Sequence, residues 1–257
     1  MPHISYSELK NWEQCAYKHK LVNIDKINNF TGNEYTAFGT ALHSVCENLL
    51  TENLGKKVDE GELFVQEFRK EVKKLDVELR KDMIVSMFEQ GVKIAPVVIP
   101  LIREHFGDFE VFAAEEKLYE DIEGLDYKFK GFIDLVFKTE DGKLHIMDYK
   151  TCSWGWGKQQ KTDKMLAYQL VLYKHFFAQR YEIDPNDIEV HFCLLKRTAK
   201  KNVVEVFSIT SGEKRTNNAL ELMTRAIKTI KNKVHIKNKL ACTKGYGCEF
   251  YKTEHCK

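Results

Sequence analysis

The sequence predicts an α/β fold, because a long helical part is followed by short strands that alternate with helices. Up to about residue 108 apolar side chains recur at helical spacing, as do Leu63, Phe64, Phe68, Val72, Leu75 and Leu79. After Gly107 the chain changes to short runs rich in Val, Ile, Phe and Tyr, which are typical of strands. The order in this second part is three strands, a helix, two strands and a helix, so we expect a sheet flanked by helices.

The individual elements can be placed along the chain. Ser7 suits the N-cap of a first helix, a second helical segment ends near Gly55, and Pro96 and Pro100 interrupt a later apolar stretch. Strands are expected over residues 109–121, 125–138, 143–150, 187–196 and 202–209, with the turn TEDG joining the second to the third. The two helices of this part carry Met165, Leu166, Gln169, Leu170, Tyr173 and Phe177, and Leu220, Met223, Ile227 and Ile230.

We expect one domain over residues 1–257, because this length with 43% hydrophobic content can bury one large core. It divides into a helical lobe (1–108), a core (109–210) and a C-terminal helix with a metal-binding tail (211–257). Lys and Arg number 40 against 38 Asp and Glu, a formal charge of +2. Composition therefore does not indicate a nucleic-acid binder, and any such binding must come from local patches.

The sequence also bears on the compartment. Its start, MPHISYSELKNW, lacks a basic stretch followed by an apolar run, and no window approaches the roughly 18 continuous apolar residues that a membrane span needs. We expect a soluble, cytoplasmic protein with no membrane partner. Seven cysteines, an odd number, argue against a disulfide framework and leave metal binding or burial.

Two carboxylates and a lysine lie in the otherwise apolar stretch GFIDLVFKTEDGKLHIMDYKT, residues 131–151. Side chains alternate between the two faces of a strand, so Asp148 and Lys150 point the same way, and His145, Met147 and Tyr149 point the other way. Asp134 lies in the preceding strand, and a short hairpin can bring it beside Asp148. Carboxylates that close raise each other's pKa unless a cation lies between them.

A hard divalent ion, Mg²⁺ or Mn²⁺, held by oxygen ligands would relieve this repulsion. Such an ion would polarise a phosphoryl oxygen and lower the pKa of a water molecule, and Lys150 could orient that water or stabilise charge on the phosphate. The alternative is structural: Asp134 pairs with Lys150 as a salt bridge, and Asp148 caps a turn. The three residues together favour the metal site.

The pattern GFID, about a dozen residues, then MDYKT resembles the PD-(D/E)XK nuclease superfamily, and within it the RecB-type branch of CRISPR-adaptation and AddB-like iron-sulfur nucleases. The resemblance implies a restriction-endonuclease-like fold with a mixed sheet. It implies catalytic and metal-binding roles for Asp134, Asp148 and Lys150, and a metal-binding backbone carbonyl at Tyr149.

The resemblance extends to other segments. ISYSELKNWEQCAYKHKL matches an N-terminal motif, and Gly39 and His43 match G-x-x-x-H, which makes His43 a metal ligand, with Glu47 one helical turn away held in reserve. AAEEKL matches an acid on the first core strand, for which we choose Glu116 and leave Glu115 open. YQLVLY matches Gln169 and Tyr173, which either position Lys150 or a phosphate or simply line a helix-sheet contact.

The C-terminal tail carries a cysteine cluster that a core does not need, because Cys242, Cys248 and Cys256 are surrounded by lysines and glycines. Neighbouring thiolates select Zn²⁺ or an iron-sulfur cluster. The resemblance implies Cys15 as the fourth ligand of a structural 4Fe-4S cluster, although Gly245 stands where the family has a cysteine.

The rival to the cluster is a zinc site of the same three cysteines with Cys15 or His255. In either case the bound group would tie the two ends of the chain together. We expect the remaining cysteines, Cys46, Cys152 and Cys193, to be packed in apolar or aromatic surroundings.

Basic and aromatic residues suggest how nucleic acid would be held. LKRTAKK (Lys196, Arg197, Lys200 and Lys201) and the segment from Lys228 to Lys244 are basic, and Trp154 and Trp156 follow the D-x-K strand. Aromatics beside lysines suit stacking on unpaired bases and neutralisation of phosphates, although charge runs are usually solvated surface. We therefore expect a preference for single strands or DNA ends.

The sequence thus predicts a Mg²⁺- or Mn²⁺-dependent deoxyribonuclease, an exonuclease of recombination, repair or phage DNA metabolism. Because the chain has no helicase motif, any unwinding would need a helicase or recombination partner protein. The first alternative is a noncatalytic nucleic-acid-binding subunit of a recombination complex on the same fold, against which the complete acid-acid-lysine set argues. A weaker alternative is a zinc-dependent nucleic-acid-binding protein, based on the cysteine tail alone.

Overall fold

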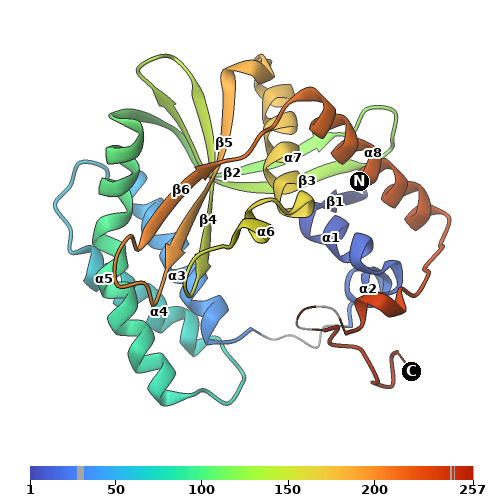
Figure 1. The fold of residues 1–257 in the computed structure, drawn as a ribbon, viewed down its shortest axis with the longest axis horizontal. Helices are drawn as coiled ribbons and strands as arrows, with labels where there is room; N and C mark the ends of the chain where they lie inside the picture. Colours follow the sequence, from blue (N-terminus) through green and yellow to red (C-terminus); the bar gives the residue numbers. More distant parts are fainter. Residues whose placement is uncertain (28–31, 244, 246, 257) are drawn as a thin grey trace. The chain divides into compact units, whose positions relative to one another are not determined.

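The computed structural model describes residues 1–27, 32–243, 245 and 247–256 (Figure 1). They form two compact units, neither of which is one continuous piece of chain. We call Thr31–Leu118 with Phe132–Gly212 the core unit, and Met1–Phe30 with Tyr119–Gly131 and Glu213–Lys257 the terminal unit. These boundaries differ from those expected at residues 108 and 210, because the terminal unit draws on both ends of the chain.

Three helices open the core unit: α3 (Glu34–Leu50), α4 (Glu60–Lys73) and α5 (Lys81–Phe106). Asn33 caps α3 with a capping box, and Asp59 caps α4. Contrary to the expectation, α5 continues through Pro96 and Pro100. Each proline removes one helical hydrogen bond, but the helix buries a stripe that includes Ile94, Ala95, Val98 and Ile102, which favours its continuation.

Helix α5 is also the one helix, within the part of the chain that the structure describes, that is long and apolar enough to cross a membrane by those two criteria alone. Its buried side chains, Met87, Ile94, Ala95, Val98 and Ile102, belong to the hydrophobic core beneath α3 and α4. Of the most apolar 18-residue window of the helix 28% is buried, so packing in this core accounts for part of its apolar composition.

The strands follow the predicted order. They are β2 (Phe109–Asp121), β3 (Lys128–Thr139), β4 (Leu144–Cys152), β5 (Ile188–Lys196) and β6 (Val204–Ser208), with β1 (His3–Ser5) before them. The sheet has six strands in the order β1-β3-β4-β5-β6, and β2 pairs with β3. It is mixed, since β3 and β4 are antiparallel, β4 and β5 parallel, and β5 and β6 antiparallel. The predicted α/β class with a mixed sheet flanked by helices is confirmed.

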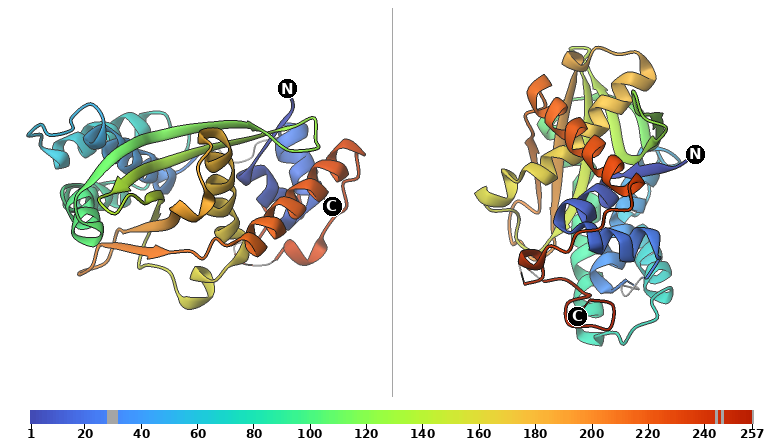
Figure 2. Two further views of the ribbon diagram at one scale, coloured as in Figure 1. Left: turned by 90° about the horizontal axis from the view of Figure 1, so that it is seen from above. Right: turned by 90° about the vertical axis from the view of Figure 1, so that its right-hand side faces the viewer.

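The core unit has helices on both faces of its sheet (Figure 2). Helix α7 (Lys164–Tyr181) follows β4 and the short α6 (Lys158–Lys161), and it packs on β4 and β5. Helices α3 and α5 contact β4 and β6 from the other face, where Met147, Tyr149, Cys193 and Leu195 point into their core. A 3₁₀ turn, η2 (Pro185–Asp187), leads from α7 into β5.

The terminal unit contains α1 (Tyr6–Gln14), α2 (Ala16–His19), the π-helical η1 (Lys20–Ile24), α8 (Glu213–Lys231) and the 3₁₀ turn η3 (Lys239–Ala241). Ser5, not the expected Ser7, caps α1: its hydroxyl accepts the Glu8 N–H while the Glu8 carboxylate accepts the Ser5 N–H. Strand β1 pairs in parallel with the beginning of β3, with His3 opposite Lys128.

Candidate active site

The hairpin of β3 and β4 brings the two predicted aspartates together. The register pairs Leu135 with Met147, so Asp134 and Asp148 stand opposite each other one position further along. Asp134 accepts a hydrogen bond through Oδ2 from the backbone N–H of Tyr149 at 2.6 Å. The carbonyl of Tyr149 remains a predicted ligand, and its ring is buried with its centroid 5.6 Å from that of His43.

His43 reaches this hairpin from α3. Its Nδ1 lies 3.3 Å from Asp134 Oδ1. The approach of α3 to β4 depends on Gly39, one helical turn earlier, because a Cβ there would lie 3.2 Å from Thr151 Oγ1. The predicted G-x-x-x-H pattern therefore combines a small residue at a close contact with an imidazole beside an acid.

Glu115 completes a group of possible metal ligands. Its carboxylate, the His43 imidazole and the Asp134 carboxylate have ligand atoms within 4.8 Å of one another. A cleft of about 500 Å³ adjoins the group and is lined by Gly39, Thr40, His43, Ser44, Glu47, Glu115 and Phe132. Glu47 thus lines the same cleft as His43, as its position one helical turn away predicts.

The structure separates the two adjacent glutamates, Glu115 and Glu116. Glu116 lies on the other side of β2, where Tyr181 Oη donates to Glu116 Oε1 at 2.8 Å and Arg180 Nη1 lies 3.3 Å from the same oxygen. The reason is a break in the strand, because Glu115 has a φ of +50°. A left-handed residue disturbs strict alternation as a bulge does, and nothing in the letters AAEEKL reveals it.

Asp148 is the most buried acid of the site, 2% exposed. Gln169 Nε2 on α7 donates to Asp148 Oδ1 at 2.8 Å and also lies 3.3 Å from Tyr173 Oη. Lys150 Nζ forms an ion pair with Asp148 Oδ2 at 2.5 Å. This buried oxygen has no hydrogen-bond partner among the described residues. The structure therefore places Gln169 and Tyr173 beside Asp148, and a buried carboxylate oxygen without such a partner is a fitting ligand for a cation.

The electrostatics of these acids also fit a cation. Burial, followed by repulsion from Asp134, raises the pKa of Glu115 to about 7. Burial raises the pKa of Asp148 to about 6, opposed by Lys150 and increased by Asp134. Burial disfavours the charged form of His43, but the Asp134 carboxylate outweighs it and the pKa of His43 is raised. Oxygen donors crowded in this way suit Mg²⁺ or Mn²⁺, whose charge would relieve the repulsion.

Metal affinity should therefore depend on pH in a defined direction. Below pH 6 Asp148 and Glu115 hold protons, which a divalent ion must displace, so affinity for Mn²⁺ should rise with pH from about 5 to 7, by up to about tenfold per unit for each proton displaced. Above the higher of the two pKa values it should level off. Titration of free Mn²⁺ by electron paramagnetic resonance at several pH values measures this, and an affinity independent of pH from 5 to 7 would contradict it.

A second candidate site lies in the terminal unit. A cavity of about 280 Å³ is lined by Cys15, Cys242, Cys248 and Cys256 together with residues of α1, α2 and the tail. The four thiols are free. Cys15 Sγ accepts the backbone N–H of Asn238 at 3.3 Å, and Cys248 N–H donates to the carbonyl of Cys242 at 3.0 Å. The structure thus brings the N-terminal cysteine and the three tail cysteines to one cavity.

The predicted metal donors differ in their relation to this cavity. Among the described residues, no three of these sulfurs form a group within 4.8 Å of one another. His255, the alternative zinc ligand, does not line the cavity, and its Nε2 lies 3.6 Å from Glu254 Oε1.

Of the other three cysteines, Cys46 and Cys193 are fully buried in the core cluster, as their apolar surroundings predict. Cys152, at the end of β4, is only partly buried.

The residues that the sequence predicts to bind DNA differ in how far their side chains are exposed. Trp154 is 77% exposed, whereas Trp156 packs against Phe192 and Phe207 with ring centroids 5.2 and 5.9 Å away. Lys196 is buried and its Nζ lies 3.0 Å from Glu205 Oε2.

The rest of the basic segments are more open. Arg197 donates to Gln90 and Ser153, whereas Lys200 and Lys201 are exposed. In the tail Lys228, Lys231, Lys233 and Lys237 are exposed, and Lys244 lies outside the described residues. Of these exposed lysines, Lys231 and Lys237 lie over the rings of Tyr127 and Tyr17.

Fold and site together define the class of protein: a mixed sheet whose hairpin presents two aspartates and a lysine, with further acids and a histidine around a cleft. The family model described as "PD-(D/E)XK nuclease superfamily" matches residues 3–256. The chain therefore belongs to the PD-(D/E)XK nuclease superfamily, as the sequence motifs predicted, and the family supports a phosphodiester hydrolase.

A solved structure shows the same fold at low sequence identity. A crystal structure of a "Putative exonuclease" from Eubacterium rectale has a TM-score of 0.59 and 12% identity, over 94% of this chain and 86% of that one. A crystal structure of SSO0001 aligns with a TM-score of 0.34 and 13% identity, over 86% of this chain and 84% of that one. No curated protein matches.

Proposed function

We propose that the protein is a Mg²⁺- or Mn²⁺-dependent deoxyribonuclease that acts as an exonuclease. One observation carries this proposal: His43, Glu115 and Asp134 lie together beside a cleft, and the neighbouring Asp148 holds Lys150, on the fold of a nuclease superfamily. The family's divalent-metal chemistry fits these donors, because they are mainly carboxylates and one buried carboxylate oxygen has no hydrogen-bond partner within the described chain.

In this proposal Asp134, Asp148, Glu115 and His43 hold the ion, with the carbonyl of Tyr149 as a further ligand. The bound ion would supply Lewis acidity at the phosphoryl oxygen and a lower pKa for the attacking water.

The protein's own groups position the reaction. Gln169 holds Asp148 through a 2.8 Å hydrogen bond, and the Tyr149 N–H holds Asp134 at 2.6 Å, so both carboxylates are fixed before substrate binds. Lys150, 28% exposed, would turn its ammonium group toward the phosphate and stabilise the negative charge that develops there. The water oxygen would bond to phosphorus and lose a proton to solvent as the bond to the leaving ester oxygen breaks, and the leaving oxygen would take up a proton.

The substrate preference is part of the same proposal. Trp154 stands exposed just after β4, and an exposed indole can stack on an unpaired base. Lys158 and Lys164 lie exposed in the segment that follows and can neutralise phosphates. We therefore propose single strands or DNA ends as substrate. The neighbour from Eubacterium rectale is described as a "Putative exonuclease", which agrees with this choice.

We extend the proposal to the cysteine cavity of the terminal unit and to the cellular pathway of the protein. A 4Fe-4S cluster held by Cys15, Cys242, Cys248 and Cys256 would be structural, tying α1 and α2 to the C-terminal tail. We place the protein in the cytoplasm, on the RecB-type branch, in recombination, repair or phage DNA metabolism. A helicase or recombination protein would supply unwinding.

One assay tests the proposed activity. Linear single-stranded and double-stranded DNA with labelled ends and closed circular duplex are incubated with the purified protein, with Mg²⁺, with Mn²⁺ or with chelator. We expect cleavage of the linear DNA with either ion, none with chelator and least on closed circles. No cleavage under any condition would contradict the enzyme and favour the noncatalytic subunit, and equal cleavage of circular duplex and linear single strands would contradict the preference for ends.

Two adjacent glutamates provide a matched pair of variants for this assay. Glu115→Gln should lower cleavage by at least about tenfold, because it removes a ligand charge from the cleft. Glu116→Gln should cleave DNA at close to the rate of the unchanged protein, because the Glu116 carboxylate contacts Arg180 and Tyr181 instead of the cleft. Equal losses in both variants would contradict the assignment of Glu115, provided that circular dichroism shows both to be folded.

A further inference from the structure

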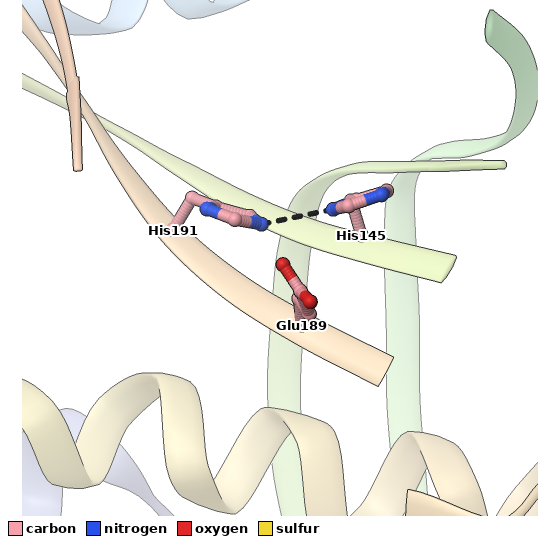
Figure 3. A group of neighbouring side chains, drawn as sticks. All are labelled: His145, Glu189 and His191. Carbon is pink, nitrogen blue, oxygen red and sulfur yellow. Dashed lines mark hydrogen bonds between the residues drawn. The ribbon is translucent and has the colours of Figure 1, made fainter. Parts of the chain in front are cut away.

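Two histidines and a glutamate form a second cluster in the core unit, on the parallel strands β4 and β5. His145 stands opposite Glu189 in the register, and Met147 stands opposite His191. Because residues two apart share a face of a strand, all three side chains lie on one face of the sheet. Figure 3 shows the carboxylate of Glu189 beside the two facing imidazole nitrogens.

The ligand atoms of this cluster are close enough for one ion. His145 Nδ1 lies 3.0 Å from His191 Nε2, and one Glu189 oxygen lies within 4.8 Å of both. Two nitrogens that bind one Zn²⁺ at about 2.0–2.1 Å in a tetrahedron lie about 3.3 Å apart, so the separation has to grow by only a few tenths of an ångström, while the rings turn so that both lone pairs point at the ion. His145 and His191 are 5% and 1% exposed, so their orientations are held by packing against Phe106 and Phe137.

A chain of hydrogen bonds assigns the protons on the two rings when no ion is bound. The Thr139 hydroxyl donates to Asp141 Oδ1 at 2.6 Å, so it accepts from His145 Nε2–H at 2.9 Å. His145 Nδ1 is then the acceptor for His191 Nε2–H, and His191 Nδ1 accepts from the Ser208 hydroxyl at 3.1 Å. The alternative to a metal site is a purely structural role for this series of hydrogen bonds, in which every ring nitrogen already has a partner.

We propose that His145, Glu189 and His191 bind a Zn²⁺ ion at a site separate from the nuclease centre. Two imidazoles and one carboxylate are a ligand set typical of zinc, with the remaining position left to water.

The partners of the outer nitrogens support this assignment. A histidine that binds a metal donates its other N–H to a neighbouring group, and His145 Nε2–H already donates to Thr139. His191 needs only to shift its proton to Nδ1, from which it donates to the Ser208 hydroxyl oxygen. Thr139 and Ser208 therefore already contact the two ring nitrogens that do not face the ion, and zinc binding changes only the tautomer of His191.

The site is accessible through its carboxylate. The Glu189 side chain is 43% exposed and pairs with Lys143, whose Nζ lies 2.6 Å from Glu189 Oε1 and whose own side chain is 48% exposed. Lys143 thus competes with a bound cation, but as an exposed side chain it can turn away. The electrostatic effect of Lys143 on zinc affinity is open to direct measurement.

The cluster lies apart from the nuclease centre. His145 packs on Phe106 of α5, whereas Asp148 bonds to Gln169 of α7 on the opposite face of the sheet. Three strand positions also separate His145 from Asp148, about 10 Å along β4. An ion here would join β4 to β5 directly and, through Thr139 and Ser208, hold β3 and β6, so its effect would be to stabilise the core unit.

The tautomer change is the most specific test, because zinc added to the full-length protein can also occupy the cysteine cavity and the nuclease centre. Imidazole ¹⁵N NMR on chelator-treated protein, titrated with Zn²⁺ alone, follows each ring, with His145→Gln and His191→Gln used to assign the signals. We expect His191 to change from the Nε2–H to the Nδ1–H form. The ¹⁵N chemical shifts of His145 Nδ1 and His191 Nε2 should change together in the same titration. Unchanged signals of both rings when the other sites are filled would overturn the proposal.

Two charge variants keep the test independent of folding. Glu189→Gln should weaken zinc binding at these rings by at least about tenfold, because it removes the anionic ligand. Lys143→Met should strengthen it, because it removes the competing cation from Glu189. Both leave the hydrogen-bond chain of the histidines intact. If both variants bind zinc at these rings as the unchanged protein does, Glu189 is not a ligand and the three-residue site is wrong.

Discussion

Lys150→Ala is expected to reduce DNA cleavage by about 10² to 10³ while the protein still binds Mn²⁺. The ammonium group lies 2.5 Å from Asp148 Oδ2 at the end of β4 and is partly exposed, so it can reach a phosphate beside the metal-binding acids. Loss of one group that stabilises the developing charge typically costs this much. The side chain is not needed for the sheet, because the register of β4 with β5 depends on the backbone.

The measurement compares initial rates on end-labelled single-stranded DNA at saturating Mn²⁺ with Mn²⁺ affinity on the same preparations. Saturation matters because Lys150 lowers the pKa of Asp148, so its removal makes Asp148 hold a proton more tightly and weakens metal binding at low pH. The assay is therefore run above pH 7. Cleavage within a few-fold of the unchanged protein would contradict the role of Lys150.

Asp148→Asn is the matched control at the neighbouring position. It removes the buried carboxylate that Gln169 holds, so it should lose both cleavage and Mn²⁺ affinity. Lys150→Ala should lose cleavage while retaining the ion at saturation. This difference separates a metal ligand from a residue that acts on the phosphate. A salt bridge that is only structural predicts that both variants lose stability and that neither loses cleavage specifically.

Cys15→Ser is expected to remove the cluster of the terminal unit. Protein isolated without oxygen should show broad absorbance near ~400 nm and about four irons per chain, and the variant should lose most of both. Cys15 and Cys242 are 227 positions apart (242 − 15), so the cluster closes a very long loop. By analogy with a crosslink over such a loop, the apparent melting temperature should fall on the order of 10 °C.

Cys152→Ser is the control for this change, since Cys152 is also partly buried but belongs to the end of β4 and does not line the cavity. It should keep the iron and the absorbance. Colourless protein that contains zinc after isolation without oxygen would overturn the iron-sulfur proposal and leave the cavity as a zinc site. Full iron in Cys15→Ser would remove Cys15 from the ligands.

Local pattern determined much of the fold. Strand alternation and the turn TEDG predicted that β3 and β4 form a hairpin, and the structure pairs Leu135 with Met147 as that hairpin requires. The order of three strands, helix, two strands and helix is confirmed as well. These features depend on neighbours in the chain, which a sequence displays directly.

The resemblance to a family predicted more about the function than the periodicity of the sequence did. The matches around His43, Asp134, Asp148 and Lys150 predicted membership of the PD-(D/E)XK nuclease superfamily, and the family comparison bears it out over nearly the whole chain. The resemblance could not separate the two adjacent glutamates of AAEEKL, which match equally well. Sequence pattern, for its part, placed an interruption at Pro96 and Pro100, where burial of one face of α5 outweighs two missing hydrogen bonds.

What the sequence determined by itself is therefore the class of fold, the order of its elements and the acids and lysine of one hairpin. Only the tertiary structure decided that Glu115 enters the cleft, because a φ of +50° at one residue turns its side chain out of the expected alternation. It likewise decided that His145 meets His191, 46 residues later, because parallel pairing of β4 and β5 leaves no trace in local sequence.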